Sequence, residues 1–182
     1  MRVIAGALRG RKLVAPKGNS TRPTADRTRE TLFNMLTSRL GSFGGLRVAD
    51  LFAGSGALGI EAISRGAAQC LFVEEDKSAI DSLRKNIESL EIDQSTKVEC
   101  ASVMRLGPMR QPFDLILLDP PYGTGAGCVA LDRLLRLGWV APHCWIALET
   151  SANEAVEVKG LSVEAERRVG KAKLTLMTQQ VE

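Results

Sequence analysis

The chain has 182 residues, 45% of them apolar and 25% charged, which is enough for one α/β domain with a full core and too few for two large domains. It holds no run of about 18 apolar residues and no apolar N-terminal segment, so we exclude a membrane-spanning or secreted protein and expect a cytoplasmic one. Four cysteines without a C-x-x-C pair and a single histidine argue against a metal site.

The net charge of +3 is unevenly distributed along the chain. Residues 1–30 hold eight basic residues against two acidic ones, a net of +6. The other 152 residues hold 16 basic and 19 acidic residues, a net of −3. A positive segment of this kind predicts a nucleic-acid partner, whose phosphates it would neutralise. The alternative is a basic face that only contacts solvent.

The first 40 residues divide into an arm and a helix. Residues 2–15 alternate loosely between apolar and polar and are punctuated by glycines, which predicts a short hairpin or extended arm. A helix is predicted over 25–40, with Thr24 as its N-cap. We therefore divide the chain into a basic arm, residues 1–24, and a larger domain, residues 25–182.

The larger domain alternates strands with helices, which is typical of a doubly wound, Rossmann-like and mostly parallel sheet. Its tail alternates apolar and polar residues on both sides of Gly170 and predicts a terminal antiparallel hairpin. The other predicted elements are strands at 46–51, 70–74, 97–100, 113–118 and 145–148, and helices from 57, over 77–90 and over 129–137.

A glycine-rich turn follows the first predicted strand. Gly54, Gly56 and Gly59 form a G-x-G-x-x-G pattern, in which the backbone turns tightly and approaches a ligand without an intervening side chain. Glu74 lies 20 residues after Gly54, where such sites place an acid on a ribose. The pattern predicts a nucleoside-containing cofactor. Asp50 would repel a diphosphate in this crevice and suits an ammonium or sulfonium group, which argues against a dehydrogenase.

The second chemical motif is Asp119-Pro120-Pro121-Tyr122, at the end of the strand predicted over 113–118. Ligands of open α/β sheets bind beyond the carboxyl ends of the strands, so this motif should face the same crevice. A base or amide NH2 is a poor nucleophile until two acceptors hold its hydrogens. The Asp119 carboxylate and the Pro120 carbonyl can be those acceptors, and Tyr122 can stack on the flat group that carries the nitrogen.

These motifs resemble those of known enzymes. Residues 50–56 resemble the first motif of class I S-adenosylmethionine-dependent methyltransferases, and residues 119–122 resemble the [DNS]-P-P-[YFW] motif of amino-methyltransferases. Segments 9–13 and 22–36, together with 50–67, resemble the bacterial 16S ribosomal RNA guanine-N2 methyltransferases, the small-subunit methyltransferase D family. The resemblance weakens after about residue 149.

The resemblance implies a methyltransferase that uses S-adenosylmethionine and modifies the N2 amine of a guanine in 16S ribosomal RNA. The guanine would be presented by the small ribosomal subunit or an assembly intermediate, and the enzyme would act as a monomer. Ser102 stands where relatives often carry Asp or Asn beside the adenine. The expected cofactor-binding residues are Asp50, Phe52, Ala53, Gly54, Ser55, Gly56, Glu74, Ser102 and Asp119. The expected catalytic residues are Asp119, Pro120, Pro121 and Tyr122, and the expected RNA contacts are Arg9, Arg11, Lys12, Arg22, Arg27 and Arg29.

Two alternatives stay open from the sequence. One is an amino-methyltransferase that acts on DNA adenine or another nucleic-acid amine, although 182 residues leave little room for a separate target-recognition region. The other is a non-catalytic RNA-binding module that keeps the fold as a scaffold, against which the complete Asp119–Tyr122 motif argues.

Overall fold

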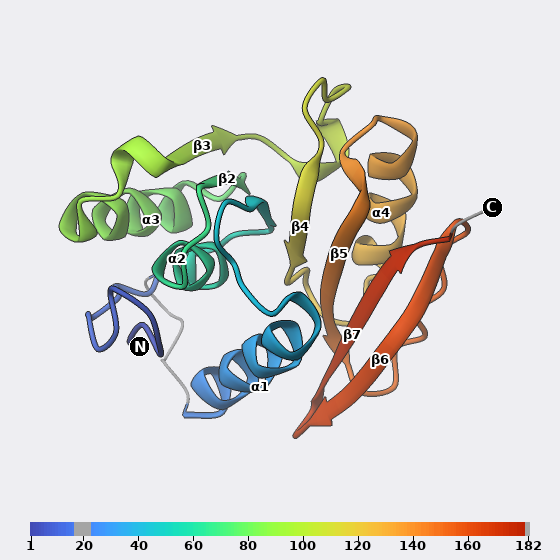
Figure 1. Cartoon of the computed structure of the whole chain (residues 1–182), viewed down its shortest axis with the longest axis horizontal. Helices are drawn as coiled ribbons and strands as arrows, with labels where there is room; N and C mark the ends of the chain where they lie inside the picture. Colours follow the sequence, from blue (N-terminus) through green and yellow to red (C-terminus); the bar gives the residue numbers. More distant parts are fainter. Residues whose placement is uncertain (17–22, 181–182) are drawn as a thin grey trace.

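The computed structural model describes residues 1–16 and 23–180, and is built on one seven-stranded sheet with strand order β3-β2-β1-β4-β5-β7-β6 (Figure 1). Strands β1 to β5 run parallel, and β7 is antiparallel to both β5 and β6. The strands are β1 Arg47–Leu51, β2 Gln69–Glu74, β3 Thr96–Cys100, β4 Phe113–Leu118, β5 Val140–Ser151, β6 Leu161–Val169 and β7 Ala172–Gln179. The helices are α1 Pro23–Leu40, α2 Ala57–Ser64, α3 Lys77–Leu90 and α4 Ala126–Arg136, with 3-10 turns η1 Asp93–Ser95 and η2 Val103–Arg105.

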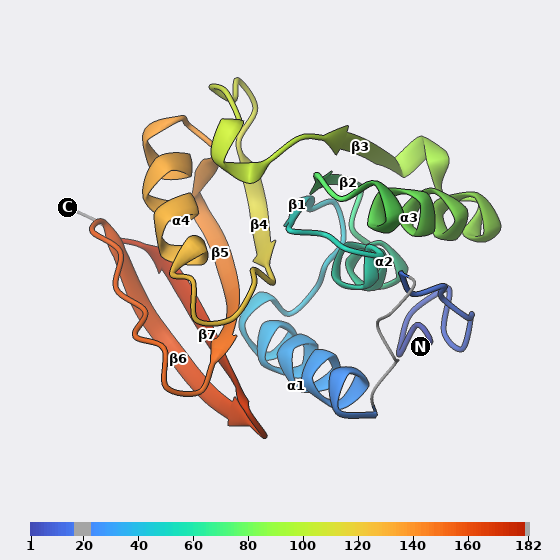
Figure 2. The same cartoon turned by 180° about the vertical axis from the view of Figure 1, so that it is seen from behind.

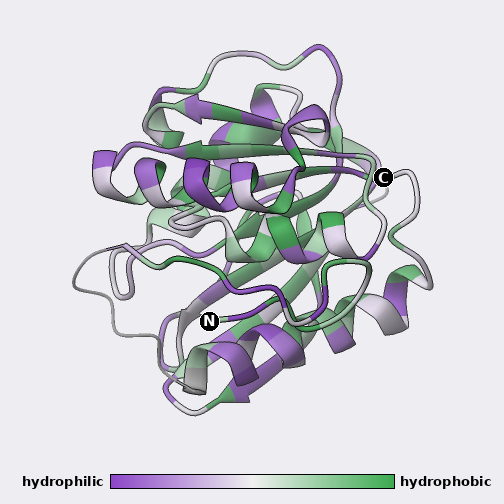
Figure 3. Cartoon of the chain, turned by 90° about the vertical axis from the view of Figure 1, so that its left-hand side faces the viewer, coloured by the Kyte–Doolittle hydropathy of each residue, from purple (hydrophilic) through white to green (hydrophobic). Residues whose placement is uncertain are grey.

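Helices cover both faces of the sheet (Figures 1 and 2). On one face, α1, α2 and α3 pack Phe33, Ile60 and Leu83 into a core with strand residues such as Leu117. On the other face, α4 packs Leu131 and its neighbours against β4 and β5. The central strands are buried on both sides, so their sequences are nearly continuous apolar runs, and hydrophilic residues gather on the outer helices (Figure 3). The predicted fold class is confirmed.

The N-terminal arm is a hairpin that packs on the domain. Arg2 and Lys12 pair in an antiparallel bridge. The side chain of Glu61 in α2 is fully buried, and its carboxylate accepts hydrogen bonds from the N–H groups of Ile4 and Ala5, both at 2.9 Å. The arm therefore has a fixed position against α2.

Several element boundaries differ from the predicted ones. Helix α1 begins at Pro23, so Thr24 lies in its first turn and the prediction of an N-cap there was wrong. Helix α4 begins three residues before the predicted start. Strand β5 begins at Val140 instead of residue 145, because the polar and proline residues at 142–143 interrupt the apolar pattern without ending the strand. The predicted hairpin is confirmed, and Gly170 turns it with φ of 59°.

Candidate active site at the carboxyl edge of the sheet

A cavity of about 920 Å³ lies where β1, β4 and β5 end, at the edge that open α/β sheets use for ligands. This volume is sufficient for a ligand of nucleoside size. The sheet contributes Asp50, Asp119 and Glu149, and the arm contributes Ala15 and Pro16. Helix α1 and the turn between β6 and β7 complete the wall.

The three glycines of the turn after β1 have different roles. An added Cβ at Gly54 would meet no atom within 4 Å, so this glycine faces open space at the cavity. At Gly56 an added Cβ would lie 2.3 Å from Leu83 Cδ1, and at Gly59 it would lie 2.4 Å from Phe72 Cε1. Gly54 thus fits the expected close approach to a ligand, whereas Gly56 and Gly59 are required for packing against α3 and β2.

The turn begins with an unusual backbone conformation. Phe52 has φ of 58°, a left-handed conformation that is uncommon for a bulky residue. Phe52, Ala53, Gly54 and Ser55 all line the cavity. A strained backbone conformation persists only where the surrounding structure fixes it, and such conformations are often found at ligand sites.

Asp50 has one oxygen with no partner. The residue is 1% exposed, and its Oδ2 accepts the Gly59 N–H at 2.8 Å, whereas its buried Oδ1 has no hydrogen-bond partner. Burial raises the pKa of Asp50 well above its usual value, and the nearby carboxylates of Asp119 and Glu74 raise it further. A cationic donor that enters the cavity would satisfy Oδ1 and favour the ionised carboxylate.

Glu74 ends β2 beside the glycine turn. Its Oε2 accepts the Gly54 N–H at 2.8 Å, and its Oε1 accepts the N–H groups of Glu75 and Asp76, both at 2.9 Å. The carboxylate therefore ties the turn to β2. An ionised carboxylate has about four acceptor positions, so Glu74 can accept a further hydrogen bond. Its predicted contact with a ribose stays a prediction.

Ser102 follows β3 and stands at the N-cap position of η2, where its side chain makes no capping hydrogen bond. Its predicted contact with an adenine also stays a prediction.

Asp119 and Glu149 meet because β4 and β5 are parallel neighbours. Leu118 pairs with Leu148, so Asp119, the first residue after β4, lies beside Glu149, which is still within β5 and pairs with Leu174 of β7. Both residues line the cavity. Desolvation by the surrounding protein and the neighbouring Glu149 carboxylate raise the pKa of Asp119 to about 8. The side chain is nevertheless exposed to the cavity. Burial also raises the pKa of Glu149. The neighbouring carboxylates therefore disfavour each other's ionised form.

Glu149 was not identified from the sequence. The signal was present, because Glu149 follows the strand predicted over 145–148 as Asp119 follows the strand predicted over 113–118. The Tyr122 hydroxyl donates a hydrogen bond to Glu149 Oε1. Tyr122 is 46% exposed and lines the cavity, so its ring has room for a flat partner.

The loop that carries the Asp119–Tyr122 motif is held by Glu154. The N–H groups of Gly123 and Gly125 donate to its carboxylate at 2.9 and 3.1 Å, and these bonds lower the pKa of Glu154. The Pro121 carbonyl accepts the Thr124 hydroxyl at 2.8 Å, and Pro120 is buried. Pro120 and Pro121 thus belong to a loop whose backbone is fixed by hydrogen bonds.

The predicted RNA contact of Arg29 was wrong. Arg29 is only 4% exposed, and its guanidinium donates to the Arg2 carbonyl and to Asp26 Oδ1, and lies 3.9 Å from Glu61. Burial lowers the pKa of Arg29 from its usual value. The side chain therefore connects α1 to the arm and to α2. Arg27 is exposed, and Arg22 lies outside the described residues.

Asn86 joins the arm to the glycine turn. This residue of α3 is fully buried, and its Nδ2 donates to the carbonyls of Val14 and Ser55, both at 3.0 Å. Its Oδ1 accepts the Val14 N–H at 2.7 Å. The arm, the cavity wall and α3 are therefore connected through a single amide side chain.

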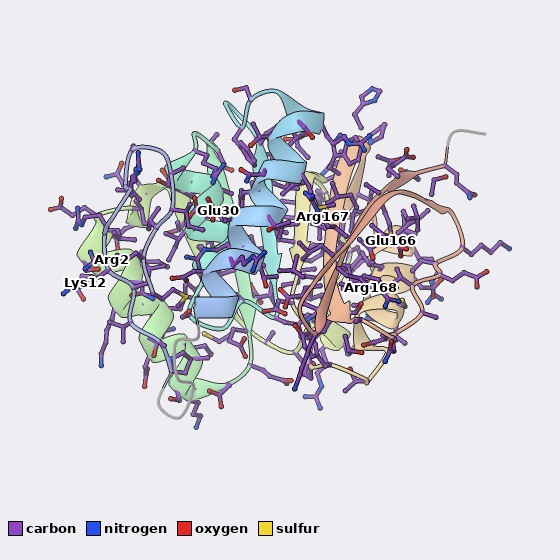
Figure 4. The ribbon with its side chains drawn as sticks, turned by 90° about the horizontal axis from the view of Figure 1, so that it is seen from below. Arg2, Lys12, Glu30, Glu166, Arg167 and Arg168 are labelled. Carbon is purple, nitrogen blue, oxygen red and sulfur yellow. The ribbon has the colours of Figure 1, made fainter. Side chains whose placement is uncertain are left out.

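Exposed basic residues lie on both sides of α1. Figure 4 views the molecule from below, the direction in which β4 and β5 point in Figure 1, and shows Arg2 and Lys12 on one side of α1 and Arg167 and Arg168 on the other. Lys171, at the β6–β7 turn, lines the cavity. The second group was missed because the tail carried no recognisable motif. We call the exposed predicted residues of the arm the arm basic set: Arg9, Arg11 and Lys12.

The chain has relatives among known proteins. Residues 1–178 match a family described as conserved hypothetical protein 95. Ribosomal RNA small subunit methyltransferase D from Haemophilus influenzae is 38% identical over 159 residues, which cover 85% of this chain and 80% of that protein. The solved structure of yhhF from Escherichia coli has a TM-score of 0.86 at 33% identity and covers 100% of this chain and 99% of its own.

The fold also extends to distant enzymes. Magnesium protoporphyrin IX methyltransferase from Synechocystis, solved with bound SAM, has a TM-score of 0.66 at 13% identity, with 90% of this chain and 87% of that chain covered. Within residues 1–16 and 23–180, no helix is long and apolar enough to cross a membrane. In the same part of the chain, no group of three His, Cys, Asp or Glu side chains could hold a metal ion.

Proposed function

Because this chain belongs to the ribosomal RNA small subunit methyltransferase D family, we propose that it transfers a methyl group from S-adenosylmethionine to the exocyclic N2 amine of a guanine in 16S ribosomal RNA. The chain is a methyltransferase by family, and the substrate and the methylated atom are the proposed part. The observation that carries the proposal is the meeting of Asp119, Glu149 and Tyr122 in one cavity with the glycine turn.

Residues that line the cavity fit the cofactor, and Glu74 and Ser102, which do not line it, would extend the site. The unpartnered Oδ1 of Asp50 can accept from the methionine ammonium, and the open face of Gly54 lets the ligand approach the backbone. Glu74 would accept from the ribose hydroxyls, and Ser102 would contact the adenine. When bound, S-adenosylmethionine supplies an electrophilic methyl group.

The acceptor side of the cavity supports nitrogen chemistry. The Asp119 carboxylate and the Pro120 carbonyl each accept a hydrogen bond from one N–H of the amine. These two bonds direct the nitrogen lone pair toward the methyl group. The amine nitrogen would take up the methyl group that the bound cofactor supplies, and Asp119 would receive the proton that the amine loses. Tyr122 stacks on the guanine and keeps the ring in the plane that this geometry requires.

The RNA partner is proposed from charge. The arm basic set and Arg27 would contact phosphates, together with Arg22 by sequence, and Arg167 and Arg168 would extend this surface beyond α1. The arm carries no aromatic residue, so it lacks a stacking platform for reading single-stranded bases. We therefore propose that the small ribosomal subunit, or an assembly intermediate, presents the guanine in a fixed shape. We expect the enzyme to act as a monomer.

The test measures transfer of the labelled methyl group to small subunits from cells that lack the enzyme, followed by nucleoside mass analysis. The proposal predicts N2-methylguanosine in 16S RNA with the wild-type enzyme. Asp119→Ala should transfer no methyl group while its calorimetric affinity for S-adenosylmethionine stays within about threefold of wild type. Methylated adenine in DNA would favour the DNA alternative. RNA binding without transfer would favour the scaffold alternative.

A further inference from the structure

We propose that Glu149 is the residue that selects guanine, by accepting a hydrogen bond from the ring N1–H beside the amine that Asp119 holds. This inference rests on the proposed methylation of guanine N2. It adds a specificity-determining residue from β5 to a site that sequence motifs place only on β1, β2 and β4.

The position of Glu149 follows from the sheet. Glu149 lies within β5 one residue after Leu148, and Asp119 follows β4 one residue after Leu118, which pairs with Leu148. Both side chains line the cavity. One oxygen of Glu149 accepts the Tyr122 hydroxyl, and the other oxygen of the carboxylate can accept a second hydrogen bond. The Tyr122 ring, which would stack on the base, is therefore hydrogen-bonded to the Glu149 carboxylate, which would accept from the edge of the base.

The chemistry of the bases makes this pair selective. Guanine presents two adjacent kinds of donor on its Watson–Crick edge, the N1–H and the N2 amine, and two neighbouring carboxylates are matched acceptors. Adenine N1 and cytosine N3 are lone-pair acceptors, and a carboxylate repels them. The cavity therefore rejects a base with the wrong ring nitrogen even when the base carries a reactive amine.

The protonation of the carboxylate pair is consistent with this role. Burial raises the pKa of Asp119 and of Glu149, so the ionised form of each group is disfavoured before a base binds. The N1–H and N2–H donors of guanine stabilise the ionised form of both carboxylates and so lower both pKa values. A purine whose N1 is an acceptor offers no donor for the second carboxylate.

The experiment uses small-subunit RNA that carries either guanine or 2-aminopurine at the target position. 2-Aminopurine keeps the 2-amino group, but its N1 is an acceptor. We expect kcat/KM of the wild-type enzyme to favour guanine by about 100-fold or more, since sites built for a hydrogen bond reject analogues that lack it. In Glu149→Gln the amide can donate to N1, so the preference should fall at least about tenfold.

Tyr122→Phe is the matched control. It removes the hydroxyl partner of Glu149 and leaves the carboxylate, so it should slow both reactions and keep the preference of the wild type. If Glu149 only positioned Tyr122, both variants would change the rates and neither would change the preference. The contribution of guanine O6 is common to wild type and Glu149→Gln, so it cancels when their preferences are compared.

If Glu149→Gln has no measurable turnover, a competition binding assay tests the inference instead. RNA with inosine at the target keeps N1–H without the amine and should compete with substrate better than RNA with purine riboside. That advantage should shrink at least about tenfold in Glu149→Gln. An unchanged preference or advantage in this variant, or a wild-type enzyme that uses 2-aminopurine as well as guanine, overturns the inference. A wild-type enzyme that does not methylate guanine N2 overturns the proposed function instead.

Discussion

Replacing Gly54 or Gly56 by alanine should separate ligand binding from folding. Both glycines have positive φ, 57° and 83°, so an alanine at either position costs about 1–2 kcal/mol of the free energy of unfolding. At Gly54 the new methyl group meets no protein atom. At Gly56 it would lie 2.3 Å from Leu83 Cδ1, and overpacking of this kind adds about 1–3 kcal/mol. Gly56→Ala should thus lose about 2–5 kcal/mol in urea unfolding, and Gly54→Ala about 1–2 kcal/mol.

Calorimetric titration with S-adenosylmethionine gives the second half of the test. The Gly54→Ala methyl group occupies the open face of the turn, so affinity should fall at least about tenfold, or roughly 1.4 kcal/mol. A Gly54→Ala protein that binds the cofactor as tightly as wild type would show that the ligand does not approach this backbone. Equal stability of the two variants would contradict the packing role of Gly56.

Three further predictions concern the same site. Glu74→Ala should weaken cofactor binding by about 1–3 kcal/mol in calorimetry, because it removes a charge-assisted acceptor and the tie to Gly54, and unchanged affinity would move the ribose site elsewhere. Methyl transfer should rise with pH through about 8, because Asp119 is protonated below that pKa and cannot accept a hydrogen bond. Glu149→Gln should shift this rise to lower pH, and a profile that is flat from pH 6 to 9 would contradict the raised pKa of Asp119. Replacing the arm basic set by alanine should flatten the log–log salt dependence of RNA binding by about 0.7–0.9 for each phosphate that is no longer neutralised, and an unchanged slope would leave these residues as a solvated face.

The sequence predicted the sheet well where burial dominates. Strand β4 and helix α3 have their predicted bounds, because a doubly buried strand is a continuous apolar run and an amphipathic helix has a clear period. The start of β5 was missed because Pro142 and its neighbours break that pattern while the strand continues. The local pattern of apolar residues predicts which positions are buried, and it predicts strand pairing only indirectly.

The site was predicted in part for a similar reason. The glycine turn and the Asp119 motif are contiguous in sequence and were recognised. Glu149 reaches Asp119 only through the pairing of β4 with β5, which is a long-range feature. Arg29 was expected to contact RNA, but the arm packs against its guanidinium and buries it. Contacts between segments that are distant in sequence therefore explain why Glu149 was missed and why the role of Arg29 was wrongly predicted.

The central claim is methylation of guanine N2 in small-subunit RNA, and nucleoside mass mapping of 16S RNA tests it most directly. RNA from cells that lack this protein should contain one unmethylated guanine at a position that is N2-methylguanosine in wild-type cells. The wild-type gene should restore the methyl group, and the Asp119→Ala gene should not. Identical methylation maps with and without the protein would contradict the account.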